Sequence, residues 1–169
     1  MPKGPANPEM TTTAAELRCA VVVSRYNAWI TDRLLLGAHQ EWERAGGATD
    51  ALEVISAPGS FELPVLARAA ATCGRFHAVV ALGCLIRGET THDQHIARSV
   101  ADGLQRIAID TGVPVAFGVL TVENEAQAEA RAGGDQGNKG AESMRAALET
   151  LAALDAIHRK TPLVGQSTR

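Results

Sequence analysis

Apolar residues along this chain follow two alternating patterns. Short, nearly continuous apolar runs are typical of strands that are covered on both faces. Between them lie longer segments in which apolar residues recur at spacings of three and four, as on one face of a helix. The runs that predict strands are 17–24, 51–57, 77–86 and 113–120.

A helical segment follows each of these runs. Asn27 stands where it can cap the first helix, and Gly46 and Gly47 are expected to end it. Further helices are predicted over about 61–73, from about residue 91, and briefly over 125–132, where a glycine-rich loop at 133–137 follows. The stripes that define the long helices are Ile30, Leu34, Ala38, Trp42 and Ala45, then Ile96, Val100, Leu104 and Ile107, and finally Met144, Leu148, Leu151 and Leu154.

Strands that alternate with helices predict a parallel sheet, because parallel neighbours are joined by right-handed helical crossovers. We therefore expect a single domain over 17–160, a three-layer α/β/α sandwich with a four-stranded parallel sheet of the flavodoxin-like kind. Residues 1–16, which hold Pro2, Pro5 and Pro8, are expected to form an extended or mobile arm. Residues 161–169 are expected to be a tail.

Composition narrows the class of partner. The 169 residues carry a formal net charge of -3 with no basic stripe, so a small molecule is a better expectation than nucleic acid. No segment predicts a signal peptide or a membrane helix, which makes the cytoplasm the default. The three cysteines, Cys19, Cys73 and Cys84, lack metal-ligand spacing and are interpreted as buried free thiols. Signatures of metal or nicotinamide enzymes are also missing from the sequence.

The segment GCLIRGETTHD (83–93), which follows the third run, holds the densest group of candidate functional residues. Gly88 permits a tight turn, and Thr90 or Thr91 can cap the next helix, whose free N–H groups and positive end would suit a phosphate. His92 is expected on the inward side of that helix as a candidate neutral base. A histidine that only bonds to its own backbone explains the spacing equally well.

The segment APGSFELP (57–64), which ends the second run, is a second candidate. A Pro-Gly turn at a helix start offers backbone N–H groups and the Ser60 hydroxyl, and Glu62 complements the helix dipole. Taken alone, this segment is best interpreted as a capped helix with a helpful acid.

Two rings and two cations complete the candidates. Tyr26 and Phe117 lie near the carboxyl ends of predicted strands, where a ligand of an open parallel sheet binds, and their rings can stack on a flat heterocycle. Core packing is the alternative, and the better one for Phe117 by itself. Arg131 and Lys139 flank the glycine-rich loop and can hold a phosphate, although such cations are usually solvated.

Taken together and in this order, the segments SRYNAWIT, APGSFELP, ALGCLIRGETTH, TGVPVAFGVLT and RAGGDQGNKGAE resemble the lumazine synthase family. The similarity extends from about Cys19 to Leu154. It implies an enzyme of riboflavin biosynthesis that condenses 5-amino-6-ribitylaminouracil with 3,4-dihydroxy-2-butanone 4-phosphate to give 6,7-dimethyl-8-ribityllumazine. Neither a cofactor nor a metal is implied.

The resemblance also implies which residues contact the substrates. On the phosphate side it places Glu89 and Thr90 as the seat, Arg131 as the cation, Lys139 near the substrate and His92 as the proton-transfer residue. The residues that it places around the pyrimidine, the ribityl chain and the pocket wall are Tyr26, Ser60, Phe61, Glu62, Cys84, Leu85 and Ile86, with Phe117 from across a subunit interface.

One stretch departs from the family pattern. After the histidine the family usually carries an aromatic residue and then an acid, whereas Asp93, Gln94 and His95 follow here. The acid that orients the imidazole is thus replaced by Gln94. Asp93 is a candidate substitute for this acid, and His95 is a candidate to share the role of His92. The same departure is the best support for an alternative function, a non-catalytic shell or carrier that binds a lumazine or flavin.

The resemblance further implies a homo-oligomer built from pentamers, which in some members pack into decamers or 60-subunit icosahedral shells. The short loop between Arg131 and Asn138 favours a shell. The prolines of the arm favour the smaller forms, because they weaken the addition of a strand to a neighbouring sheet.

Overall fold

A computed structural model of the chain describes residues 13–160, so that most of the predicted arm and the whole predicted tail lie outside the described residues. Within this range Ala14 is already buried, and its N–H donates to the carbonyl oxygen of Ala45 at 2.7 Å. The packed part of the chain therefore includes at least Ala14.

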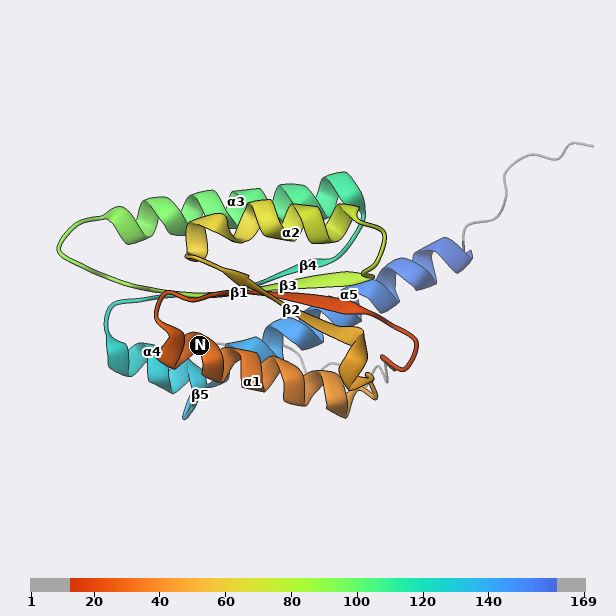
Figure 1. Cartoon of the computed structure of the whole chain (residues 1–169), viewed down its shortest axis with the longest axis horizontal. Coiled ribbons are helices and arrows are strands. Elements are labelled where there is room, and N and C mark those ends of the chain that lie inside the picture. Colours follow the sequence, from red (N-terminus) through yellow and green to blue (C-terminus); the bar gives the residue numbers. More distant parts are fainter. Residues whose placement is uncertain (1–12, 161–169) are drawn as a thin grey trace, which may run out of the picture.

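The elements alternate as the hydrophobic pattern predicts (Figure 1). The main elements are β1 (Cys19–Ser24), α1 (Ala28–Arg44), β2 (Leu52–Ala57), α2 (Leu63–Thr72), β3 (Ala78–Ile86), α3 (His92–Thr111), β4 (Val115–Val122), α4 (Glu125–Arg131) and α5 (Lys139–Lys160). Two short helical turns, η1 (Thr49–Ala51) and η2 (Ser60–Glu62), precede β2 and α2.

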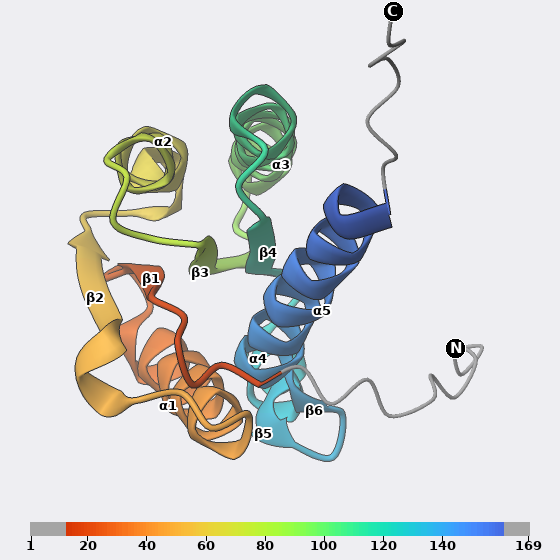
Figure 2. The same cartoon turned by 90° about the vertical axis from the view of Figure 1, so that its right-hand side faces the viewer.

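The sheet has four parallel strands in the order β2-β1-β3-β4, which confirms the predicted fold class. Helices α2 and α3 cover one face, and α1, α4 and α5 cover the other (Figures 1 and 2). The two faces of β1 point into different cores: Val21 packs with α1 and α5, and Val22 packs with α2 and α3. A strand with both faces covered must be apolar at every position, which explains the continuous run.

The predicted stripe of α1 is buried, with Ile30, Leu34, Ala38 and Trp42 all at 0% exposure. The helix ends where expected, since Gly46 takes the left-handed conformation at a φ of 82° that glycine adopts without strain.

Three local predictions are wrong. Asn27 stands at the N-cap of α1 but in the left-handed region, and its side chain makes no capping bond. The glycine-rich loop forms a small antiparallel hairpin of β5 (Ala132–Gly134) and β6 (Gly137–Asn138). Cys73 is exposed, because it follows the last turn of α2.

Candidate active site

The carboxyl ends of β1, β2 and β3 and the start of α3 surround a cavity of about 450 Å³, here called the ring pocket. Chain order reverses between β1 and β3, since β2 lies on one side of β1 and β3 on the other. In open parallel sheets ligands bind at such a switch point. The residues that line the ring pocket are Tyr26, Asn27, Gly59, Ser60, Phe61, Glu62, Cys84, Leu85, Ile86, Gly88, Thr90, His92, Asp93 and Ile96.

Most of the predicted site residues therefore meet in one cavity. The segment after β1 contributes Tyr26, η2 contributes Ser60, Phe61 and Glu62, and the end of β3 contributes Cys84, Leu85 and Ile86. Thr90 and His92 complete this group from the start of α3. Glu89 is exposed in the segment before α3 and is outside this lining.

The aromatic side chains of the ring pocket are held at its rim. Tyr26 is 70% exposed and Phe61 is 60% exposed, so neither fills the core of its own chain. Flat rings with one face open to a cavity can stack on a heterocycle.

Deeper in the ring pocket the walls are apolar or hold unsatisfied polar atoms. Burial raises the pKa of the Cys84 thiol to about 11, so this group stays neutral at physiological pH. The Ser60 hydroxyl is buried, and no partner for it exists among residues 13–160. A Cβ at Gly83 would lie 2.6 Å from the Ser60 Oγ, so the glycine leaves the room that this hydroxyl needs. A buried hydroxyl without a partner is costly, which favours a polar ligand there.

The first turn of α3 differs from the sequence prediction. Thr91 stands at the N-cap without a capping bond from its side chain. His92 and Ile96 line the same cavity, as their one-turn spacing predicts, but His92 is exposed and Asp93 is the buried side chain of this turn. One carboxylate oxygen of Asp93 has no hydrogen-bond partner within the described part of the chain.

A second cavity, of about 480 Å³, lies along β4 and is here called the cation pocket. It holds the remaining predicted residues: Phe117 from β4, Arg131 from the end of α4 and Lys139 from the start of α5. Phe117 is 45% exposed. Core packing, which the sequence favours for this residue by itself, is therefore wrong. The ring of Phe117 is on the open edge strand, where it can contact a neighbouring molecule.

The two pockets are separate in one chain. For residues 13–160, no residue lines both, and the ring pocket is built on β1, β2 and β3 whereas the cation pocket follows β4. The structure thus brings His92 together with the ring-binding candidates, and leaves Arg131 and Lys139 elsewhere.

Sequence reasoning missed three side chains at these pockets. Asn27 lines the ring pocket, and its Nδ2 donates to the Cys84 carbonyl at 3.0 Å, a partner that no local pattern signals. The sequence indicates Asp93 only as an aid to His92, whereas the structure places it as a buried carboxylate of the ring pocket. Glu142 lines the cation pocket and pairs with Lys139, which the spacing of three residues on a helix could have revealed.

Groups of side chains that could hold a metal ion do not occur within 13–160. In the same range, none of the helices has the length and apolar character that crossing a membrane requires.

Comparison with known proteins agrees with this geometry. Residues 16–155 match the family model described as 6,7-dimethyl-8-ribityllumazine synthase. A protein of that name from Xanthomonas oryzae pv. oryzae (strain PXO99A) is 48% identical over 140 residues, which cover 83% of this chain and 91% of that protein. Another from Xylella fastidiosa (strain 9a5c) is 45% identical over 143 residues, or 85% of this chain and 93% of its relative.

The matched range contains every element from β1 to β6 and most of α5, and hence both pockets. This chain therefore belongs to the 6,7-dimethyl-8-ribityllumazine synthase family.

Proposed function

We propose that this chain catalyses the reaction for which its relatives are named, the formation of 6,7-dimethyl-8-ribityllumazine in riboflavin biosynthesis. The substrates would be 5-amino-6-ribitylaminouracil and 3,4-dihydroxy-2-butanone 4-phosphate, and the protein would act in the cytoplasm. One observation carries the proposal: the ring pocket gathers aromatic rings, a carboxylate, a hydroxyl without a partner and an imidazole at the switch point of the sheet.

The ring pocket suits the aminouracil. Tyr26 and Phe61 can cover the faces of a flat ring, while Glu62 and Ser60 can hydrogen-bond to its polar edge and to a ribityl hydroxyl. Cys84 stays uncharged and contributes wall rather than a nucleophile. A ligand of this kind would supply the donor or acceptor that the Ser60 hydroxyl lacks.

The cation pocket suits the phosphate of the second substrate. Arg131 presents a planar guanidinium and Lys139 an ammonium, the two side chains that hold phosphate groups most often. Since these cations and His92 lie in different pockets of one chain, the proposal requires a site that two copies share. The ring pocket of one subunit would face Phe117, Arg131 and Lys139 of its neighbour. The pentamer that the resemblance implies provides such contacts, and a decamer or a 60-subunit shell would retain them.

The proposed chemistry needs positioning and proton transfer. The 5-amino group of the uracil attacks the ketone carbonyl, and loss of water leaves an imine. Removal of a proton then expels inorganic phosphate and forms an enol, which takes up a proton at its terminal carbon to become a methyl ketone. The ribitylamino nitrogen attacks this ketone and closes the ring with loss of water. His92 at the pocket wall would accept and return these protons. Holding both substrates in one site lowers the barrier by several kcal/mol, up to ~11 in well-oriented models.

The test is incubation of the purified, assembled protein with both substrates while the absorbance of the lumazine product is followed. The expected result is product formation well above the uncatalysed rate of the same mixture. A protein that binds the lumazine but does not accelerate its formation would instead be the carrier or shell that the sequence Asp93-Gln94-His95 brought into consideration.

A further inference from the structure

The two cations of the cation pocket flank the hairpin of β5 and β6, since Arg131 ends α4 and Lys139 begins α5. In the register of the hairpin, Ala132 of β5 is the partner of Asn138 of β6. Arg131 directly precedes one member of this pair, and Lys139 directly follows the other. We therefore expect a shift of Asn138 to change the positions of both cations.

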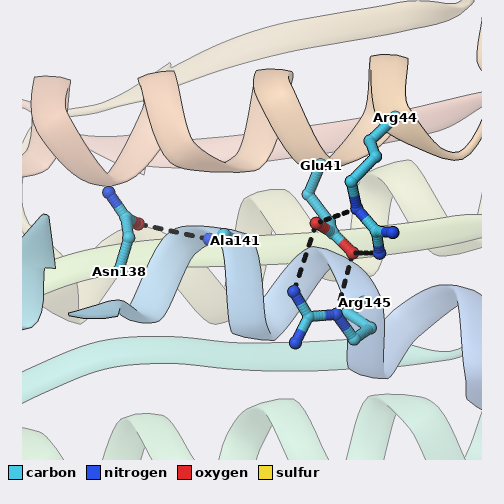
Figure 3. A network of polar contacts seen from close by, with 5 residues as sticks. All are labelled: Glu41, Arg44, Asn138, Ala141 and Arg145. Atoms are coloured by element: carbon cyan, nitrogen blue, oxygen red, sulfur yellow. Dashed lines mark hydrogen bonds and ion pairs between the residues drawn. The ribbon is translucent and has the colours of Figure 1, made fainter. Parts of the chain in front are cut away.

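Asn138 is held by both ends of its side-chain amide. Its Oδ1 accepts hydrogen bonds from the backbone N–H groups of Gly140 at 2.8 Å and Ala141 at 3.2 Å, which caps α5. Figure 3 shows the bond to Ala141. Its Nδ2 donates to the backbone carbonyl oxygen of Arg33 in α1 at 2.9 Å. The first bonds are local and the last joins segments that lie 105 residues apart.

Helix α1 packs closely against the Asn138 amide and against the start of α5. A Cβ at Gly37 would lie 2.2 Å from the Asn138 Oδ1, and a Cβ at Gly140 would lie 1.8 Å from the carbonyl oxygen of Leu34. Both distances are far below van der Waals contact, so the two glycines permit the close approach. The hairpin thus packs against one turn of α1, from Arg33 to Gly37.

We propose that Asn138 is a positioning residue: its bond to the Arg33 carbonyl sets where Arg131 and Lys139 present their charges to a phosphate ester. The inference rests on the proposed function, in which the cation pocket binds the phosphate of the ketose substrate. A planar guanidinium binds phosphate well only in a narrow range of orientations, so a hairpin that shifts on α1 loses affinity for the phosphate while its charges remain.

The same pair of helices has another polar contact that serves as a control. Arg145 of α5 donates to the carboxylate of Glu41 of α1 at 2.8 Å, and Arg44 bonds to the same carboxylate (Figure 3). Figure 3 shows this cluster further along the helices than Asn138. Neither Glu41 nor Arg145 lines the ring pocket or the cation pocket.

The decisive experiment compares Asn138→Ser, Asn138→Ala, Gly37→Ala and Glu41→Gln in the assembled enzyme. A serine keeps an oxygen that caps the helix but cannot reach Arg33, whereas alanine loses both contacts. Gly37→Ala displaces the amide from the side of α1, although alanine itself favours a helix. The KM of each substrate, kcat and the melting temperature are measured for all variants.

We expect Asn138→Ser and Gly37→Ala to raise the KM of the ketose phosphate about tenfold, with the KM of the aminouracil changed less than about twofold. Asn138→Ala should show the same split together with a lower melting temperature. Glu41→Gln should lower the melting temperature and leave both KM values unchanged. If the KM values of Asn138→Ser and Gly37→Ala equal those of the wild type, Asn138 only caps α5 and does not position the cations. An equal rise in Glu41→Gln would show that general loosening of the helix pair is the cause.

Binding of inorganic phosphate, measured by calorimetry, separates this inference from the proposed function. If no lumazine forms but the wild type binds phosphate more tightly than Asn138→Ser, the positioning role stands and the proposed activity fails. Equal phosphate affinity in the two proteins overturns the positioning role. A wild-type protein that binds no phosphate overturns the positioning role, while the formation of lumazine still decides the proposed function.

Discussion

The ring pocket and the cation pocket differ in how the chain builds them. The ring pocket collects the ends of three strands, and its position follows from the topology of the sheet. The cation pocket lies along the edge strand β4, and the end of α4 and the start of α5 supply its cations. The ring pocket offers apolar walls with a few polar atoms, whereas the cation pocket offers two cations and one carboxylate beside one exposed ring.

This difference separates two tasks. A cavity at the ends of three strands gathers aromatic rings, polar atoms and an imidazole, which suits ring recognition and proton transfer. An exposed edge suits a charged group that must enter and leave. Because the two tasks lie in different places of one chain, complete activity is expected only where two chains meet.

The largest expected effect comes from the imidazole of the ring pocket. His92→Ala should lower kcat by roughly 10²–10⁴-fold without abolishing turnover, because positioning of the substrates remains. Steady-state kinetics with both substrates measures this. His95→Ala, an exposed neighbour outside the pocket lining, is the matched control and should be close to wild type. An unchanged kcat in His92→Ala would remove His92 from the mechanism.

The next effect belongs to the cation pocket. Arg131→Ala should raise the KM of the ketose phosphate by about 10–100-fold, the loss expected for a charge-assisted hydrogen bond of about 1.5–3 kcal/mol. If the site is shared between subunits, mixed oligomers reassembled from His92→Ala and Arg131→Ala chains should regain activity that neither variant has alone. The rate of the mixture compared with the two separate variants checks this, and the absence of any recovery would contradict a shared site.

A third prediction concerns stability outside both pockets. The hydrogen bond from Arg44, aided by Arg145, lowers the pKa of the Glu41 carboxyl to about 2, although burial of this side chain acts in the opposite direction. A carboxyl whose pKa is lowered by folding stabilises the native state above its unfolded pKa near 4.5 and loses this contribution as the pH falls toward 2.

Glu41→Gln should therefore destabilise the protein by an amount on the order of 2–3 kcal/mol at neutral pH and by progressively less in acid. Urea denaturation at a series of pH values measures it. A destabilisation that stays constant across this range would mean that the ionised carboxylate is not its source.

The smallest expected effect returns to the cation pocket. Glu142 forms an ion pair with Lys139, and both side chains are partly exposed. Glu142→Gln should free the ammonium and lower the KM of the ketose phosphate by about two- to fivefold, since exposed pairs contribute about 0.2–1 kcal/mol. The same kinetic assay at two salt concentrations tests it, because the gain should shrink as ionic strength rises. A higher KM in this variant would indicate that Glu142 itself aids binding.

The ring pocket was largely predictable from the sequence, and the cation pocket was not. Tyr26, the segment from Ser60 to Glu62 and the segment from Cys84 to His92 all lie at or just after the carboxyl ends of parallel strands, which meet at one edge. The sequence contains nothing comparable for Arg131 and Lys139. Their distance from His92 depends on how α4 and α5 pack against β4, which no local pattern reports.

Hydrophobic periodicity by itself determined the order of strands and helices along the chain, the parallel three-layer sandwich and the buried stripes. The reason is that the spacing of apolar residues in each element shows which of its faces are buried. Only the tertiary structure decided where polar side chains find their partners. Asn27 bonds to the Cys84 carbonyl instead of capping its own helix, and Asn138 both caps α5 and holds α1. An amide has donors and an acceptor that serve local and distant partners equally well, so its choice depends on which backbone groups the packed fold brings within reach.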